Sequence, residues 1–194
     1  VAIMGHYSHP VELSTPMSRE AVRRIRETGA NIRMQSPLIR HVNDDPDVWT
    51  EMWNTGVRLG LIPYYFFVER DTGARGYFET PLDKCHEIFV EAYSKVSGIA
   101  RTVRGPSMSA FPGKVHILGV RDVGGQKAFV LGYPQGRRGE PVRQPFFAKY
   151  DPKATWFDTL EPLTEADAPF FPGNWPDAAE ETPGTVPLTV GSAS

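Results

Sequence analysis

Residues 45–68 read DPDVWTEMWNTGVRLGLIPYYFFV, and this stretch contains one complete helix-strand unit of the fold. Asp45 offers a capping oxygen ahead of Pro46, whose fixed φ suits the first position of a helix and whose missing N–H costs nothing there. Apolar residues recur at helical spacing up to Gly60, which suits the left-handed conformation that commonly ends a helix. The apolar and aromatic run Leu61–Val68 then predicts a strand. The stretch therefore predicts an amphipathic helix that leads into a strand.

The same pattern occurs on both sides of this stretch. Thr15-Pro16 and Thr80-Pro81 predict two further helix starts. Glycines at positions 29 and 98 predict the matching helix ends. The predicted strands are the short apolar or β-branched runs Val1–Met4, Asn31–Met34, Leu61–Val68 and Ile99–Val103. Because strands and helices that alternate at roughly 30 to 35 residues are typical of right-handed βαβ units, we predict an α/β fold with a mostly parallel sheet, either open or closed as a barrel.

The composition is that of an ordinary globular protein. The 194 residues are 40% hydrophobic and 23% charged, with neither an apolar run of membrane-spanning length nor a signal-peptide core. We therefore expect a cytoplasmic protein with no membrane and no nucleic-acid partner. Because a strand-like run begins at Val1, we also expect the natural chain to begin further upstream. The single cysteine, Cys85, falls on the apolar face of a predicted helix and is expected to be a buried structural thiol.

Charge is unevenly distributed along the chain. Residues 1–153 contain all 21 Lys and Arg and carry a net charge of +5, whereas the remaining residues carry −7. A mildly basic body suits an anionic ligand such as a phosphorylated cofactor, although solvated surface charge explains the same excess. From Leu163 onward Pro, Gly, Ala, Thr and acidic residues dominate, so residues 163–194 are predicted to form a tail that is disordered or lies on a partner.

Lys114 is the residue that most suggests chemistry. It follows the stretch RGPSMSAFPG, residues 104–113, and directly precedes the strand-like run Val115–Val120. We therefore predict that it lies in a loop rich in small residues. An amine held in such a loop could bind a phosphate or bond covalently to the aldehyde of a cofactor. A solvated loop lysine is the alternative.

Other polar residues follow the ends of the predicted strands. His6 and His9 follow the first strand, Gln35 the second and Arg70 the third. Because ligands of α/β folds bind where the carboxyl ends of the strands emit their loops, we expect these side chains to share a rim with Lys114. The simpler explanations are hydrogen bonding for the histidines, surface placement for Gln35 and an ion pair with a neighbouring acid for Arg70. The two histidines lack a third ligand, so no metal site is predicted.

After Lys114 the pattern changes to β structure. The runs Val115–Val120 and Lys127–Leu131 predict a hairpin that turns at Gly124-Gly125. The aromatic-rich stretch 145–152 is expected to pack against the sheet. The predicted parts of the chain are residues 1–120, residues 121–162 as a β-hairpin and aromatic extension, and residues 163–194 as the acidic tail.

Five ordered motifs resemble the C-terminal portion of the lysine 2,3-aminomutase family. They are GHYSHP at residues 5–10, QSPLIRHVND at 35–44, PYY at 63–65, FETP at 78–81 and PGK at 112–114. Members of that family are radical S-adenosylmethionine enzymes with a partial (β/α) barrel, a [4Fe–4S] cluster and pyridoxal phosphate. The resemblance therefore implies that residues 1–120 form the C-terminal half of such a barrel, followed by a β-rich extension.

The resemblance also implies an activity and roles for particular residues. Family members are isomerases that move an amino group between neighbouring carbons of an amino-acid substrate. Lys114 matches the lysine that holds pyridoxal phosphate, and His6 and Gln35 match positions lining the S-adenosylmethionine pocket. The cluster is held by a CxxxCxxC motif upstream of the matched region, and one cysteine cannot replace three thiolates. We therefore expect this chain to be inactive alone, and to act as part of a longer, homo-oligomeric enzyme.

Arg70 departs from the pattern of the lysine-specific members. It occupies the position of one of two aspartates that bind the distal ammonium of lysine. Because like charges repel at short range in a desolvated site, we expect a glutamate-like substrate, although Asp71 could restore an acid. Two other interpretations stay open: a pyridoxal phosphate protein without radical chemistry, and a non-catalytic barrel fragment or interaction protein.

Overall fold

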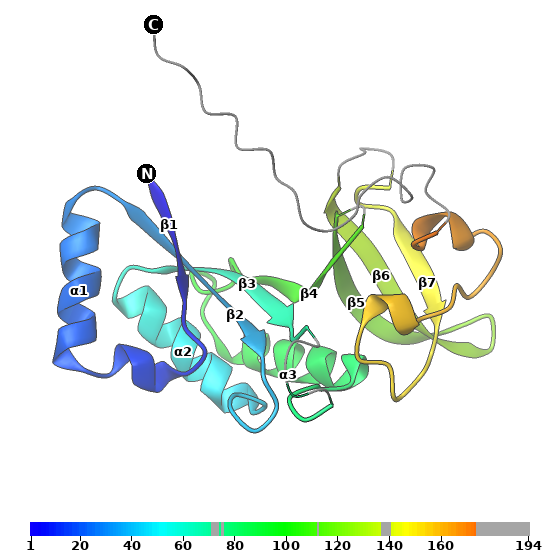
Figure 1. Cartoon of the computed structure of the whole chain (residues 1–194), viewed down its shortest axis with the longest axis horizontal. Helices are drawn as coiled ribbons and strands as arrows, with labels where there is room; N and C mark the ends of the chain where they lie inside the picture. Colours follow the sequence, from blue (N-terminus) through cyan, green and yellow to red (C-terminus); the bar gives the residue numbers. More distant parts are fainter. Residues whose placement is uncertain (71–73, 75, 112, 137–140, 174–194) are drawn as a thin grey trace, which may run out of the picture.

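The computed structural model describes residues 1–70, 74, 76–111, 113–136 and 141–173, which form a mixed α/β structure built on one seven-stranded sheet (Figure 1). The strands are β1 Ala2–His6, β2 Asn31–Leu38, β3 Ile62–Val68, β4 Arg104–Ala110, β5 Gly113–Val123, β6 Gln126–Gly136 and β7 Pro145–Lys149. The α-helices are α1 Pro16–Glu27, α2 Pro46–Arg58 and α3 Leu82–Lys95. Neighbouring strands follow chain order, with β1 to β4 parallel and β4 to β7 antiparallel. The predicted α/β class and parallel first half are thus confirmed.

Helices cover one face of the parallel half of the sheet, and no α-helix of the described residues lies on the other face, which we call the open face (Figure 1). Along β2, the side chains of Ile32, Met34 and Leu38 are buried in the same core as the apolar residues of α2 and α3. The alternate residues Arg33 and Gln35 point to the opposite face and are only partly covered. The open face therefore carries the polar side chains that are available to a ligand.

Aromatic side chains join α2 and α3 to the sheet. The ring of Phe66 on β3 lies 4.3 Å from Trp49, 6.3 Å from Trp53 and 5.4 Å from Phe89, measured between ring centres. Each large side chain buried in this way contributes about 1.5–3 kcal/mol to stability. The residues of α3 buried in the core are Leu82, Cys85, Ile88 and Ala92, as the helical spacing predicted. This packing fixes β3 and β4, which carry part of the candidate site.

The predicted apolar face of α1 packs only in part. Val22 is buried and Ile25 is half-buried, but Met17 is 84% exposed. The edge strand β1 likewise exposes Ile3 and Met4. The β1 end of the sheet therefore exposes several apolar side chains.

Two of the three predicted helix starts are confirmed. The Thr15 side chain accepts a hydrogen bond from the Ser18 N–H, and the Asp45 side chain accepts one from the Asp47 N–H. Pro16 and Pro46 follow these caps in the first turn of their helices. The glycines at 29 and 60 have φ of 81° and 78°, as expected for helix ends.

The prediction for the third helix is wrong at both ends. Pro81 is the residue that precedes the helix, which begins at Leu82, and no side chain caps it. The Thr80 hydroxyl is instead buried without a protein partner. The helix ends at Lys95 with an extended Val96, so Gly98 is not its terminating residue.

The largest correction concerns the stretch that leads to Lys114. Residues 99–103, predicted as a strand, are mostly turns, and residues 104–110, predicted as a loop, form β4 in the middle of the sheet. Lys114 consequently lies on β5 rather than in a loop. Gly105, which suggested a loop, is instead needed for close packing within the sheet. A Cβ at this position would lie 2.4 Å from the Phe66 carbonyl oxygen, where β4 approaches β3.

The two strands ahead of the first helices are also longer than predicted. β1 continues to His6 and β2 continues to Leu38. Gln35 therefore lies within β2 instead of following it, and its side chain points to the open face.

The antiparallel half contains the predicted hairpin. Val123 of β5 pairs with Gln126 of β6 across Gly124-Gly125, and both glycines have positive φ. A segment after β7 then folds back onto the sheet, and its Phe157 and Phe171 are buried together with Tyr133 of β6 and Phe146 of β7.

The tail does not begin at Leu163 as predicted. Residues 163–173 are packed: Phe171 is 4% exposed, and the Tyr133 hydroxyl donates a 2.6 Å hydrogen bond to the Phe170 carbonyl. The stretch is held because its aromatic rings find a buried surface that composition alone does not show. The rest of the predicted tail, residues 174–194, lies outside the described residues.

The described strands form a sheet whose two edges are β1 and β7. The partial barrel implied by the family resemblance therefore stays a prediction. In the described part of the chain, every helix is too short or too polar to cross a membrane.

Candidate functional site

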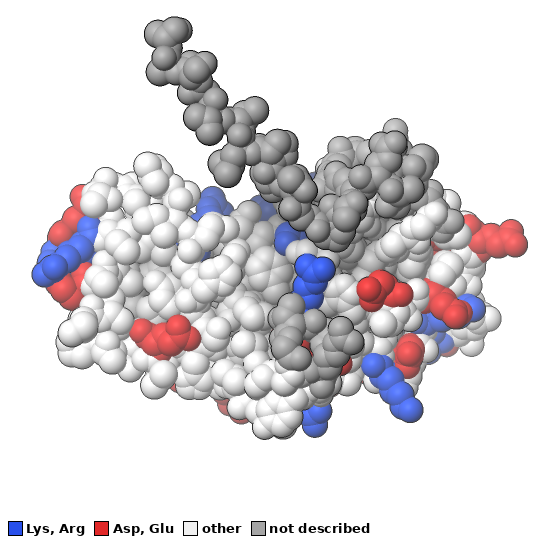
Figure 2. Space-filling view, viewed as in Figure 1, with Lys and Arg blue, Asp and Glu red and all other residues white. Residues whose placement is uncertain are grey.

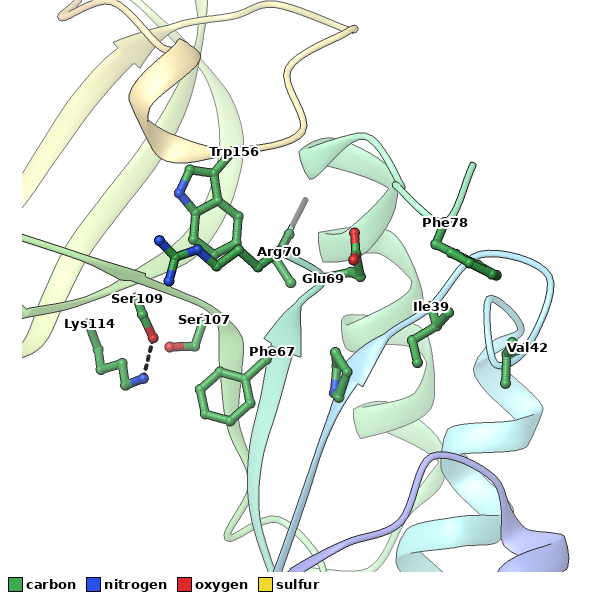
Figure 3. A pocket seen from close by; sticks show the side chains of 12 residues that line it. Ile39, Val42, Phe67, Glu69, Arg70, Phe78, Ser107, Ser109, Lys114 and Trp156 are labelled. Atoms are coloured by element: carbon green, nitrogen blue, oxygen red, sulfur yellow. Dashed lines mark hydrogen bonds between the residues drawn. The ribbon is translucent and has the colours of Figure 1, made fainter. Parts of the chain in front are cut away.

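A cavity of about 660 Å³ opens near the carboxyl ends of β3 and β4 (Figure 3). The polar side chains that line it are those of Glu69, Arg70, Ser107, Ser109 and Lys114. Its apolar lining includes Pro37, Phe67 and Trp156. The cavity is large enough for a small-molecule cofactor or substrate, because ligand pockets commonly measure about 300–1,000 Å³.

Lys114 is held at this cavity by the pairing of β4 with β5. It stands directly opposite Ser109, and its Nζ donates a hydrogen bond to the Ser109 hydroxyl (Figure 3). The ring centre of Phe67 lies 4.6 Å from Nζ. Partial burial lowers the pKa of the Lys114 amine below its ordinary value. A lower pKa favours the neutral amine, which is the nucleophilic form.

Arg70 shares this cavity with Lys114, as the rim prediction expected. It follows β3 directly after Glu69, and both side chains line the cavity (Figure 3). Asp71, the acid that could offset Arg70, lies outside the described residues.

Trp156 also lines the cavity but was not identified from the sequence. It comes from the segment that folds back after β7, more than 40 residues beyond Lys114 in the chain. The only available signal was the aromatic content of that region, which core packing explains equally well.

His6 and Gln35 form a second polar pair on the open face. They are register partners on β1 and β2, and their Nε2 atoms are 3.1 Å apart. Neither residue lines the cavity that contains Lys114, but Pro37, two residues after Gln35 on the same strand, does. The predicted juxtaposition of His6 and Gln35 is thus present, beside the cavity.

His9 does not join these residues. Its Nδ1 accepts a hydrogen bond from the Val11 N–H at the start of the 3₁₀ helix Pro10–Leu13, and Glu12 bonds back to the His9 N–H. His9 is therefore a capping residue, and it is not among the residues that line the cavity of Lys114.

Cations and aromatic rings lie close together on β2, β3, β4 and β5. The guanidinium carbons of Arg33 and Arg104 lie 4.9 and 5.5 Å from the ring centre of Tyr64. Arg104 and Lys114 lie 5.9 and 5.8 Å from the ring centre of Tyr65. Within the described residues, none of these three cations has an ion-pair partner. Figure 2 shows Lys and Arg side chains near the middle of the molecule, and such a surface suits an anionic ligand.

Three polar atoms are buried beside Lys114 without a partner in the protein. They are the Tyr65 hydroxyl, the Ser107 hydroxyl and Nε2 of His116. Ser107 and His116 are direct register partners on β4 and β5, and the Tyr65 and His116 ring centres are 6.2 Å apart. Burial, together with the nearby Arg104 and Lys114, lowers the pKa of the His116 imidazole to about 4. His116 is therefore neutral near pH 7.

Cys85 is not part of the site. Its thiol is fully buried and donates to the Thr80 carbonyl at 3.4 Å. Burial raises the pKa of this thiol well above its usual range, which suppresses the reactive thiolate. The described residues contain no group of three His, Cys, Asp or Glu side chains placed to hold a metal ion.

Comparison with known proteins identifies relatives of the chain. A putative L-lysine 2,3-aminomutase of Aquifex aeolicus (strain VF5) is 32% identical over 163 residues, which are 83% of this chain and 41% of that protein. The L-lysine 2,3-aminomutase of Escherichia coli (strain K12) is 27% identical over 110 residues, 54% of this chain and 32% of that protein. The chain is a homologue of the lysine 2,3-aminomutases. This confirms the resemblance carried by the five motifs.

The relatives also include a protein named for a different substrate. The glutamate 2,3-aminomutase of Clostridioides difficile (strain 630) is 28% identical over 100 residues, 52% of this chain and 24% of that protein. The chain thus spans less than half the length of each of these aminomutases. No family model matches the sequence.

Proposed function

We propose that this chain is part of a radical S-adenosylmethionine aminomutase in which Lys114 binds pyridoxal phosphate. The observation that carries the proposal is the position of Lys114, whose partly buried amine faces a cavity of about 660 Å³. The relatives named as aminomutases support the reaction class.

The residues around Lys114 fit pyridoxal phosphate. The lysine supplies the amine for its aldehyde, and the rings of Phe67 and Trp156 offer flat apolar surfaces for its own ring. The buried Ser107 hydroxyl lacks a protein partner and can bind a polar group of the ligand. When bound, the cofactor supplies electron delocalisation to an attached amino group. The protein's part is to hold the ligand and to keep the amine partly away from water.

The residues do not fit a [4Fe–4S] cluster. The chain has one cysteine, which is buried in the core beneath the sheet, whereas a cluster needs several thiolates. The cluster must therefore be bound by other residues of a longer protein. His6 and Gln35, the polar pair beside the cavity, are the residues that we assign to the S-adenosylmethionine pocket.

We propose a substrate with a neutral or acidic side chain. Arg70 lines the cavity, and a cation close to the distal ammonium of lysine would oppose its binding by several kcal/mol in a partly desolvated site. The relative named glutamate 2,3-aminomutase is consistent with an acidic substrate. Assays of the longer, cluster-containing protein with glutamate and with lysine test this assignment. Turnover of lysine with none of glutamate would reject it.

The assignment of Lys114 is tested by trapping the cofactor. Incubation with pyridoxal phosphate and reduction with borohydride should label the Lys114 peptide, as read by mass spectrometry. Lys114→Ala should abolish this label. Lys127→Ala is a matched control, because Lys127 also lies against an aromatic ring, 3.7 Å from the centre of Tyr150, but on β6 and outside the cavity. Loss of labelling in Lys127→Ala with retention in Lys114→Ala would overturn the assignment.

A further inference from the structure

Three buried polar atoms next to Lys114 are not explained by the packing of the sheet. Tyr65 is 3% exposed and Ser107 is 0% exposed, yet neither hydroxyl has a partner in the protein. Nε2 of His116 is buried and unpartnered in the same way. A buried polar group without a hydrogen bond costs about 1–3 kcal/mol. Three such atoms on neighbouring strands therefore indicate a polar guest.

The strand register brings the three residues together on one face. Ser107 pairs with Phe67 on one side and with His116 on the other. The rings of Tyr65 and Phe67 are stacked 4.9 Å apart, and the Tyr65 ring stands edge-on to His116. Lys114 is two residues from His116 on β5, so both side chains point to this face. Ser107 also lines the cavity of Lys114, which connects the three atoms with the amine.

We propose that Tyr65, Ser107 and His116 hold a water molecule through which Lys114 exchanges a proton when it reacts with an aldehyde. The inference rests on the proposed role of Lys114 and adds a proton acceptor to it. The acceptor is Nε2 of His116, since the remaining groups are two hydroxyls. The charged groups close to the imidazole are Arg104 and Lys114. Both keep it neutral before the reaction and favour rapid loss of the proton once the imidazolium has formed.

The proton transfer can be written as a balanced step. The N–H bond of the Lys114 ammonium breaks, and its proton joins the water. A different O–H bond of the water breaks, and that proton joins Nε2 of His116. Lys114 is left with the lone pair that attacks the aldehyde carbon. A second N–H proton of the attached nitrogen then passes to the former aldehyde oxygen, the imidazolium returns its proton to the same oxygen, and this oxygen leaves as water. No other reactant is needed.

The experiment follows the rate at which the full chain captures pyridoxal phosphate. Capture is read from the visible absorbance of the bound cofactor, and borohydride trapping confirms that the label is on Lys114. His116→Ala should capture the cofactor about 10- to 100-fold more slowly than the wild type, as expected when a general base is lost. Added imidazole should restore much of the rate in His116→Ala and leave the wild type unchanged. A purely structural role would not give this rescue.

The hydroxyls are tested by variants that keep the ring or backbone in place. Tyr65→Phe and Ser107→Ala each remove one hydroxyl, and each should slow capture severalfold while the melting temperature stays the same or rises. His86→Gln is the control for a histidine outside the site, because His86 is half-buried on α3 and does not line the cavity. It should capture the cofactor at the wild-type rate.

The outcomes separate this inference from the proposed function. A folded His116→Ala that captures the cofactor at the wild-type rate, or a slow one that imidazole does not restore, overturns the proton-exchange role alone. A wild type that carries no label on Lys114 overturns the proposed function, and the inference fails with it. Circular dichroism of each variant shows whether a slow rate reflects misfolding, and the two hydroxyl variants then decide the question.

Discussion

Replacing Gly105 with alanine should damage the fold and the candidate site together. Gly105 lies at the start of β4, where this strand approaches β3. A Cβ at this position would meet the Phe66 carbonyl oxygen at 2.4 Å and the Phe66 Cβ at 3.0 Å. Phe66 is fully buried between Trp49 and Phe89, so it cannot move away easily. The new methyl group must therefore push β4 away from β3.

The expected cost follows from the observed crowding. Overpacking a well-filled site destabilises a protein by about 1–3 kcal/mol. Gly105 also has a φ of 154°, a conformation that other residues rarely adopt, which adds to the cost. We expect Gly105→Ala to lose about 2 kcal/mol, which for a protein of this size lowers the melting temperature by about 4–8 °C.

The site should respond because β4 carries two of its residues. Ser107 and Ser109 lie two and four residues after Gly105, and Ser109 accepts the hydrogen bond of Lys114. A shift of β4 should therefore also weaken capture of pyridoxal phosphate.

Thermal unfolding and urea titration measure the stability, with Gly98→Ala as the matched control. Gly98 lies in an exposed turn, and a Cβ there would meet nothing within 4 Å. The control should change the stability by no more than about 0.5 kcal/mol. If Gly105→Ala is as stable as Gly98→Ala, the close approach of β4 to β3 is not what requires the glycine.

Two further predictions concern titratable groups away from the trapping chemistry. The pKa of His116 is about 4 in the folded protein and near 6.5 in the unfolded chain, so between these pH values the unfolded state binds more protons. The free energy of unfolding should therefore fall as the pH drops from about 6.5 to 4. His116→Gln should flatten this slope in urea titrations, and an equally steep slope in the variant would mean that other groups cause it. Cys85 should resist thiol reagents in the native protein, because its thiol is fully buried and its pKa is raised, and it should react when urea unfolds the protein. Rapid reaction under native conditions would show that the helix opens locally.

The parallel half of the fold could be predicted because its signals are local. Thr15, Pro16, Asp45 and Pro46 fix helix starts by bonds to their own neighbours, so no knowledge of the rest of the chain is needed. The start of the third helix was predicted wrongly, because Pro81 precedes the helix instead of occupying its first position.

β4 could not be predicted because its conformation depends on its neighbours. The residues Gly-Pro-Ser at 105–107 are typical of turns, whereas Ile99–Val103 looks like a strand. Packing between β3 and β5 overrides these preferences, and Pro106, Ser107 and Met108 are all buried. The juxtaposition of Tyr65 and His116 could not be predicted for the same reason, because these residues come together only through the pairing of β3, β4 and β5.

The move of Lys114 from a loop to a strand changes what this residue can do. Lys95, at the end of α3, is a contrasting case: it is paired with Asp47 and Glu91, and these hydrogen bonds raise its pKa. Lys114 has no such carboxylate among the described residues, and its burial lowers its pKa instead. The two lysines thus differ in the direction of their pKa shifts because one is stabilised as a cation and the other is partly desolvated. A strand also fixes the backbone, so the amine is held against Ser109 and Phe67 before any ligand arrives. These properties favour an amine that forms a covalent bond over one that only attracts a phosphate.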